Sequence, residues 1–176
     1  MVDRHSLWDG AAKAGLVLGG VCVLYMALTA LTGMVAGGSQ AMAIVVSILN
    51  ALLWAAKFFG CLFLLRLFMA RWSVSNPEAG NSDVFRFGMV TALLSALVYS
   101  GCYLAYVTFI NPDIFSEAMQ ILQGNPMMDK ASMEAMENMI PMMPTYAFFG
   151  NLIYCWLFGT VLSAIYSRNI PPRNPF

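Results

Sequence analysis

Four long runs of apolar residues, separated by shorter polar breaks, dominate the pattern of the chain. The runs cover residues 11–34, 41–69, 84–109 and 145–166. A helix needs about 20 apolar residues to cross the hydrocarbon core of a bilayer, and each run meets that length. The pattern therefore predicts an all-α, polytopic membrane protein with four transmembrane helices, organised as a single membrane domain over residues 1–176.

The long break, residues 111–144, has a helical pattern of its own. Glycine and proline divide it into two parts, and in each part apolar residues recur at spacings of three and four. In the second part, one side carries Met133, Met136, Ile140 and Met143. We expect two short amphipathic helices here, with this outer amphipathic face turned to the membrane surface or to the end of the bundle.

Basic residues are distributed unevenly between the two sides of the predicted bundle. The ends of the chain and the break between the second and third runs carry Arg4, Lys13, Arg66, Arg71, Arg86, Arg168 and Arg173. The opposite side carries only Lys130, beside five acidic residues of the long break. By the positive-inside rule, both termini are expected in the cytoplasm, and the loop of residues 111–144 outside. The predicted location is a bacterial inner membrane.

The composition leaves little for catalysis or metal binding. Four spans and one loop account for most of the 176 residues, and the one histidine, His5, lies near the amino terminus. No phosphate-binding glycine loop and no paired carboxylates on a span are recognisable. The four cysteines lie one in each run, without a CxxC pair, and behave as small apolar groups. We therefore predict no enzyme, no catalytic residue, no metal, no cofactor and no nucleic-acid partner.

Small residues recur at every fourth position in the first run. Ala11, Gly15 and Gly19 lie on one face of the predicted helix, so another backbone can approach closely there. This stripe is either a dimer interface or a surface for packing within the bundle.

A polar stripe lies on the second run. Asn50, Trp54 and Lys57 share one helix face, and Lys57 is the one charged residue deep inside a run. Intramembrane charge is costly and often functional. The lysine either snorkels to cytoplasmic water or makes a polar contact within the bundle or with a partner. None of the four runs contains Asp or Glu, which disfavours an ion-coupled transporter.

Two further groups of residues recur at helical spacing. Tyr99 and Tyr103 share a face with Tyr106 near the end of the third run, and we expect the two deeper rings to face a partner helix. The long break is rich in methionine, whose thioether is a soft ligand for copper(I). Methionine also fills adaptable apolar contact surfaces, and no histidine or cysteine accompanies this group. A contact surface is therefore the prediction.

The chain also resembles a known family. The features are Lys13, Gly15 and Gly19 in the first run, an arginine-terminated second run, Phe85-Arg86-Phe87-Gly88, and Ile110-Asn111-Pro112-Asp113. Together they resemble the domain of unknown function 4199 family, small membrane proteins of the Bacteroidota. The resemblance implies four spans without an assigned activity, and an association with a membrane family 2 glycosyltransferase. The methionine-rich loop departs from the family pattern.

Two functional hypotheses follow. The first is a non-enzymatic accessory or scaffold subunit of the inner membrane, whose partner is either itself or another membrane protein. The resemblance implies that this partner is a glycosyltransferase acting on a lipid-linked sugar. The alternative is a small oligomeric transporter or channel, with the polar stripe of the second run lining its pathway.

Overall fold

The computed structural model describes residues 4–35, 40–123 and 130–170, and the fold is all-α. Within these residues, four helices are long and apolar enough to cross a membrane, which indicates a multi-pass membrane protein. They contain the four predicted runs, the third of which continues beyond its helix into a π turn. The elements are α1 (Arg4–Val35), α2 (Gln40–Ser75), α3 (Asn81–Ala105), the π turn (Tyr106–Ile110), α4 (Ile114–Gln123), α5 (Lys130–Met139), a 3-10 turn (Ile140–Met142) and α6 (Met143–Asn169).

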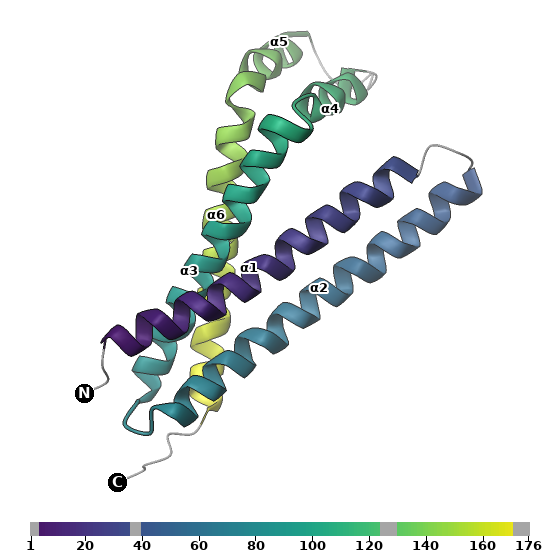
Figure 1. The fold of residues 1–176 in the computed structure, drawn as a ribbon. Helices are drawn as coiled ribbons and strands as arrows, with labels where there is room; N and C mark the ends of the chain where they lie inside the picture. Colours follow the sequence, from purple (N-terminus) through teal and green to yellow (C-terminus); the bar gives the residue numbers. More distant parts are fainter. Residues whose placement is uncertain (1–3, 36–39, 124–129, 171–176) are drawn as a thin grey trace.

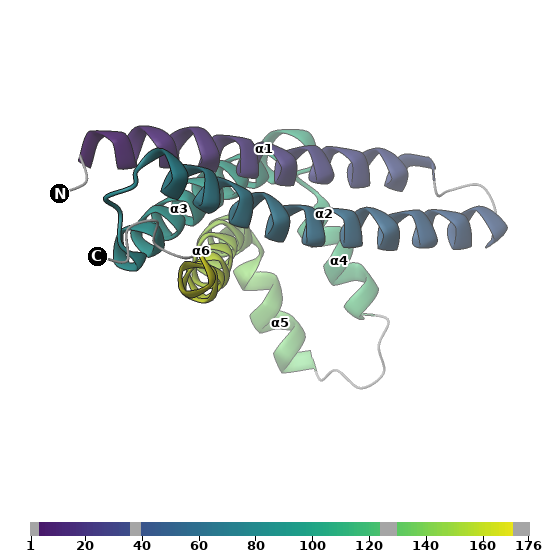
Figure 2. The same ribbon diagram turned by 90° about the horizontal axis from the view of Figure 1, so that it is seen from below.

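The long helices form two pairs that meet at one end and diverge at the other (Figure 1). Helices α1 and α2 form an antiparallel hairpin, and α3 runs beside α6. Helix α3 is central, because it packs extensively against both α1 and α6. The beginning of α1, the link between α2 and α3, and the end of α6 share the end where the pairs meet. Helices α4 and α5 lie at the far end of α3 and α6, as the view from below also shows (Figure 2).

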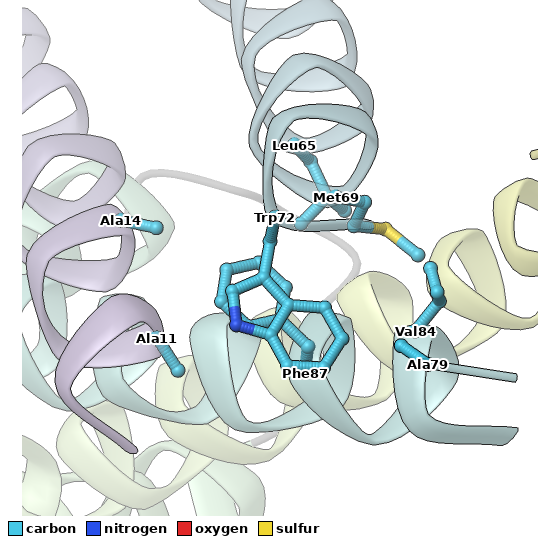
Figure 3. Close-up of a cluster of buried hydrophobic side chains, with 8 residues drawn as sticks. All are labelled: Ala11, Ala14, Leu65, Met69, Trp72, Ala79, Val84 and Phe87. Atoms are coloured by element: carbon cyan, nitrogen blue, oxygen red, sulfur yellow. The ribbon is translucent and has the colours of Figure 1, made fainter. Parts of the chain in front are cut away.

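A cluster of buried side chains packs between the helices at the end where the two pairs meet (Figure 3). Small residues of α1 allow larger residues of α2 and α3 to fill the space between the helices. The indole of Trp72 stacks on the ring of Phe87, with 4.8 Å between the ring centroids. The cluster comprises Ala11, Ala14, Leu65, Met69, Trp72, Ala79, Val84 and Phe87.

The link between α2 and α3 is shorter than the polar break in the sequence suggests. From its content of Asn, Ser, Gly and Pro we expect a loop over residues 73–83, but helix continues to Ser75 and resumes at Asn81. Tertiary packing explains the difference, since burial of the Trp72 side chain holds the last turns of α2 in helical form. At the start of α3, the backbone N–H of Gly80 donates to the Asp83 carboxylate at 3.2 Å.

The small-residue stripe of α1 packs against α3 within the same chain. A Cβ added to Gly15 would lie 2.8 Å from Cβ of Leu94, and one added to Gly19 would lie 2.8 Å from Cβ of Val98. Both glycines are buried. This geometry fits packing within the bundle, the second of the two alternatives for the stripe. Glycines play the same part between α3 and α6, where Gly88 faces Ser163 and Gly159 faces Ala92.

The two short helices expected in the long break are present as α4 and α5. The outer amphipathic face is distributed over three elements, because helix α5 ends before Ile140 and Met143 begins α6. Met136, Ile140 and Met143 are half-buried, and the Met133 side chain lies outside the described residues. At the end of α3, the N–H of Asn111 donates to the carbonyl of Tyr106 at 2.9 Å, five residues back, which makes this turn a π turn.

Candidate functional site

A pocket lies between the α1–α2 hairpin and α6, near the middle of the long helices. Its volume is about 200 Å³, and most of its lining is apolar or aromatic. All four long helices contribute to the lining: Leu18 from α1, Phe58 from α2, Ser95 from α3 and Phe158 from α6. We call it the central pocket.

Lys57 is the one charged residue among the described residues that line the central pocket. Its Nζ atom lies 4.7 Å from the ring centroid of Tyr25 and 5.2 Å from that of Tyr99. These rings belong to α1 and α3, so the half-buried lysine points into the bundle. Both distances are within the range of cation–π attraction. The geometry fits the internal contact rather than snorkelling to cytoplasmic water.

The structure separates the three residues of the predicted polar stripe. The hydroxyl of Thr32 donates to Oδ1 of Asn50 at 2.7 Å, so Asn50 and Lys57 both contact α1. Trp54 instead lines the central pocket with 55% of its surface exposed. Its ring stacks on Phe58 at 5.4 Å. Two residues of the stripe thus face the bundle, and the third lies at the rim of the pocket.

A second pocket, the tyrosine pocket, lies beyond Lys57. Its volume is about 280 Å³, and it runs between α1 and α3 as far as Ile114 at the beginning of α4. Its rings are Tyr25 of α1, Tyr99 and Tyr103 of α3, and Tyr106 of the π turn. The ring centroids are 6.3 Å apart from Tyr99 to Tyr103 and 6.5 Å apart from Tyr103 to Tyr106. Tyr99 faces α1, in line with its expected helix–helix contact. Tyr25 and Tyr99 therefore connect the surroundings of Lys57 with this second pocket.

Sequence reasoning missed four aromatic residues of the site. Tyr154 and Phe158 of α6 stack at 6.3 Å, and Phe158 lies 6.0 Å from Phe58 across the central pocket. Tyr154 is 69% exposed and forms the rim opposite Trp54. The pairs Trp54–Phe58 and Tyr154–Phe158 each have i, i+4 spacing. This spacing of aromatic residues in the sequence could have identified Phe58, Tyr154 and Phe158 as candidates. The missed residues are Tyr25, Phe58, Tyr154 and Phe158.

Three cysteines line the central pocket, and two of them are in contact. The Sγ atoms of Cys22 and Cys61 lie 3.8 Å apart, between α1 and α2. Cys155 lines the same pocket from α6. Among the described residues, no group of three or more His, Cys, Asp or Glu side chains is arranged to hold a metal ion. The pair is a weak thiol–thiol contact that joins the two helices of the hairpin.

We expect mild oxidation with copper phenanthroline to join Cys22 to Cys61, because their sulfur atoms already touch. Counting maleimide-reactive thiols in the denatured protein should then show a loss of two. Cys22→Ala should abolish this loss, whereas Cys102→Ala should preserve it. Loss of two thiols in Cys22→Ala would contradict the arrangement of α1 and α2.

Comparisons with known proteins add a family match. The family model described as "Protein of unknown function (DUF4199)" matches residues 13–168, which include most of all four long helices. No curated protein and no solved structure matches the chain.

Proposed function

We propose that this chain, which belongs to the DUF4199 family of proteins of unknown function, is a non-enzymatic accessory or scaffold subunit of a complex in a bacterial inner membrane. Its partner in this proposal is a membrane glycosyltransferase acting on a lipid-linked sugar. That partner comes from the family resemblance described above. The bundle would stabilise the membrane segment of the enzyme without taking part in the chemistry.

Two exposed aromatic residues at the middle of the helices carry the proposal. Trp54 is 55% exposed and Tyr154 is 69% exposed, and they flank the central pocket. Exposed Trp and Tyr of membrane proteins concentrate at the membrane–water interface, where the polar end of the ring meets water. In the apolar middle of a span, an indole N–H or phenol O–H needs a protein partner. A helix of a second protein laid across the pocket would cover both rings.

The distribution of charge supports the orientation that we propose. Arg71 and Arg86 flank the α2–α3 link, at the same end as the last turn of α6 with Arg168 (Figure 1). All three side chains are exposed. The positive-inside rule assigns this end to the cytoplasm, so both termini are cytoplasmic and α4 and α5 lie outside. The enzyme segment would then meet the bundle from within the same membrane.

Co-purification from the native host tests the proposal. A tagged chain extracted in a gentle detergent is expected to retain a membrane enzyme in stoichiometric amount, identified by mass spectrometry. Truncation of aromatic anchors is costly at interfaces, so the double variant Trp54→Ala/Tyr154→Ala should reduce recovery of the enzyme by about tenfold or more.

Leu52→Ala/Leu157→Ala is the matched control, because both leucines are exposed on the same two helices. Recovery from this control should stay at the wild-type level. A homo-oligomer that contains no second protein would refute the subunit proposal.

The alternative function, an oligomeric transporter or channel, rests on the polar residues that α2 turns into the bundle. Lys57 contacts two tyrosine rings, and Asn50 accepts a hydrogen bond from Thr32. In an oligomer, these residues would line the pathway. Solute flux into liposomes containing this protein alone would favour the alternative over the subunit.

A further inference from the structure

The charge of Lys57 lacks an acidic counterpart in the membrane. Residues 11–34, 41–69, 84–109 and 145–166 contain no Asp or Glu. The rings of Tyr25 and Tyr99 attract the ammonium group, but cation–π contacts offset only part of the cost of a charge at this depth. The site therefore carries a positive charge, and an anion from outside the chain can neutralise it.

The central pocket adjoining this charge has the lining of a site for an alkyl chain. Leu62, Leu65 and Leu162 line it together with the aromatic residues described above. Its volume of about 200 Å³ is below the range of roughly 300–1,000 Å³ typical of sites for drug-sized ligands. It therefore takes part of a chain rather than a whole lipid. Two rim residues, Trp54 and Tyr154, line the pocket and are exposed, so the pocket opens to the outside of this chain's bundle.

The tyrosine pocket adjoins Lys57 through Tyr25 and Tyr99, which line this pocket and contact the ammonium group. Tyr103 and Tyr106 line this pocket, which ends beside Ile114 where α4 begins. Tyrosine hydroxyls donate hydrogen bonds to anionic oxygens, whereas the rings tolerate an apolar surrounding. An anionic head can thus be solvated by the protein between the end of the bundle and the lysine.

We propose that Lys57 and the two pockets bind an anionic amphiphile, an alkyl chain that ends in a carboxylate or a phosphate. The head lies beside Lys57 and the tyrosines, and the beginning of the chain fills the central pocket. The positive charge selects anionic over neutral amphiphiles. This binding is a property of the chain by itself and does not require the proposed partner protein.

Fluorescence quenching in nanodiscs of phosphatidylcholine tests this proposal. The probes are a fatty acid and an alkyl phosphate brominated near the head, because bromine quenches an indole that it touches. A brominated alcohol of equal length is the neutral control. Both anionic probes should quench saturably and the alcohol should not. Trp54→Phe should remove the saturable part, because that indole lines the pocket.

Two variants of Lys57 distinguish the effect of its charge on binding from the effect of its side-chain shape. Lys57→Met keeps most of the side-chain volume without the charge and should weaken binding of both anionic probes by about tenfold or more. Lys57→Arg should retain binding. Tighter binding of the acid would identify a free fatty acid as the source of the anion, and tighter binding of the phosphate would identify a lipid phosphate.

Competition in the wild-type protein gives a second measurement that does not depend on the folding of any variant. Unbrominated hexadecanoic acid should relieve the quenching, and hexadecanol should not. Equal quenching by the brominated alcohol, equal relief by hexadecanol, or unchanged binding in Lys57→Met would overturn the proposal. Co-purification without a partner would refute only the subunit function, since the probes are tested on the isolated chain.

Discussion

Gly159→Ala is expected to destabilise the bundle strongly. A Cβ on this glycine of α6 would overlap Cβ of Ala92, which is fixed directly to the backbone of α3. Ala92 has no longer side chain that can move aside, so the two helices would have to separate. Overpacking of this kind costs about 1–3 kcal/mol, which corresponds to a fall in apparent Tm of roughly 2–12 °C for a chain of this length. Size-exclusion chromatography after heating measures the change.

Gly150→Ala is the matched control for this prediction. Gly150 belongs to the same helix, and nothing lies within 4 Å of a Cβ added to it. Alanine should therefore be neutral there or stabilise the helix by about 0.5–1 kcal/mol. Equal apparent Tm values for the two variants would show that α3 and α6 do not pack as described.

Gly19→Leu should displace α1 from α3. Beyond the close approach to Val98, a Cβ at this position would lie 3.1 Å from the carbonyl oxygen of Ser95, which belongs to the backbone and cannot rotate away. The longer leucine side chain has no space to occupy between the helices. We expect a lower apparent Tm and loss of the monodisperse species, measured by the same heating experiment.

Gly20→Leu distinguishes this packing from a role of α1 in dimerisation. Gly20 is exposed, and an added Cβ meets nothing within 4 Å, so the stability of this control should be unchanged. The measurement has a clear opposite outcome. If Gly19→Leu kept its apparent Tm and altered only the oligomeric state, the stripe would be a dimer interface.

The membrane-spanning helices were predictable because length and apolar composition suffice to identify them. The ends of helices were less predictable, because tertiary contacts decide them. The Trp72–Phe87 stack extends α2 beyond its apolar run, and no local signal in residues 70–83 gives this contact. Pro141, by contrast, is a local signal that predicts the end of the second short helix, and α5 does end just before it, at Met139.

The candidate site was predictable only in part. Lys57 is identifiable because a charge within an apolar run is rare. Its neighbours Tyr25 and Tyr99 come from two other helices, so their approach depends on how α1 and α3 cross. Glycines such as Gly15 indicate that a close crossing exists but not which helix forms the other side. Asn50 and Trp54 share a face by their spacing, but Asn50 contacts Thr32 of α1 whereas Trp54 lies exposed at the rim of the central pocket.

The π turn at the end of α3 changes the direction in which the chain leaves that helix. A hydrogen bond from Asn111 back to Tyr106 encloses one more residue than an α-helical turn does. One residue corresponds to about 100° of rotation around a helix. The chain therefore leaves α3 rotated by about this angle from the direction that a regular α-helix would give, before residues 111–113 lead to α4. A single extra residue therefore works here as an angular offset at the point where the chain leaves α3.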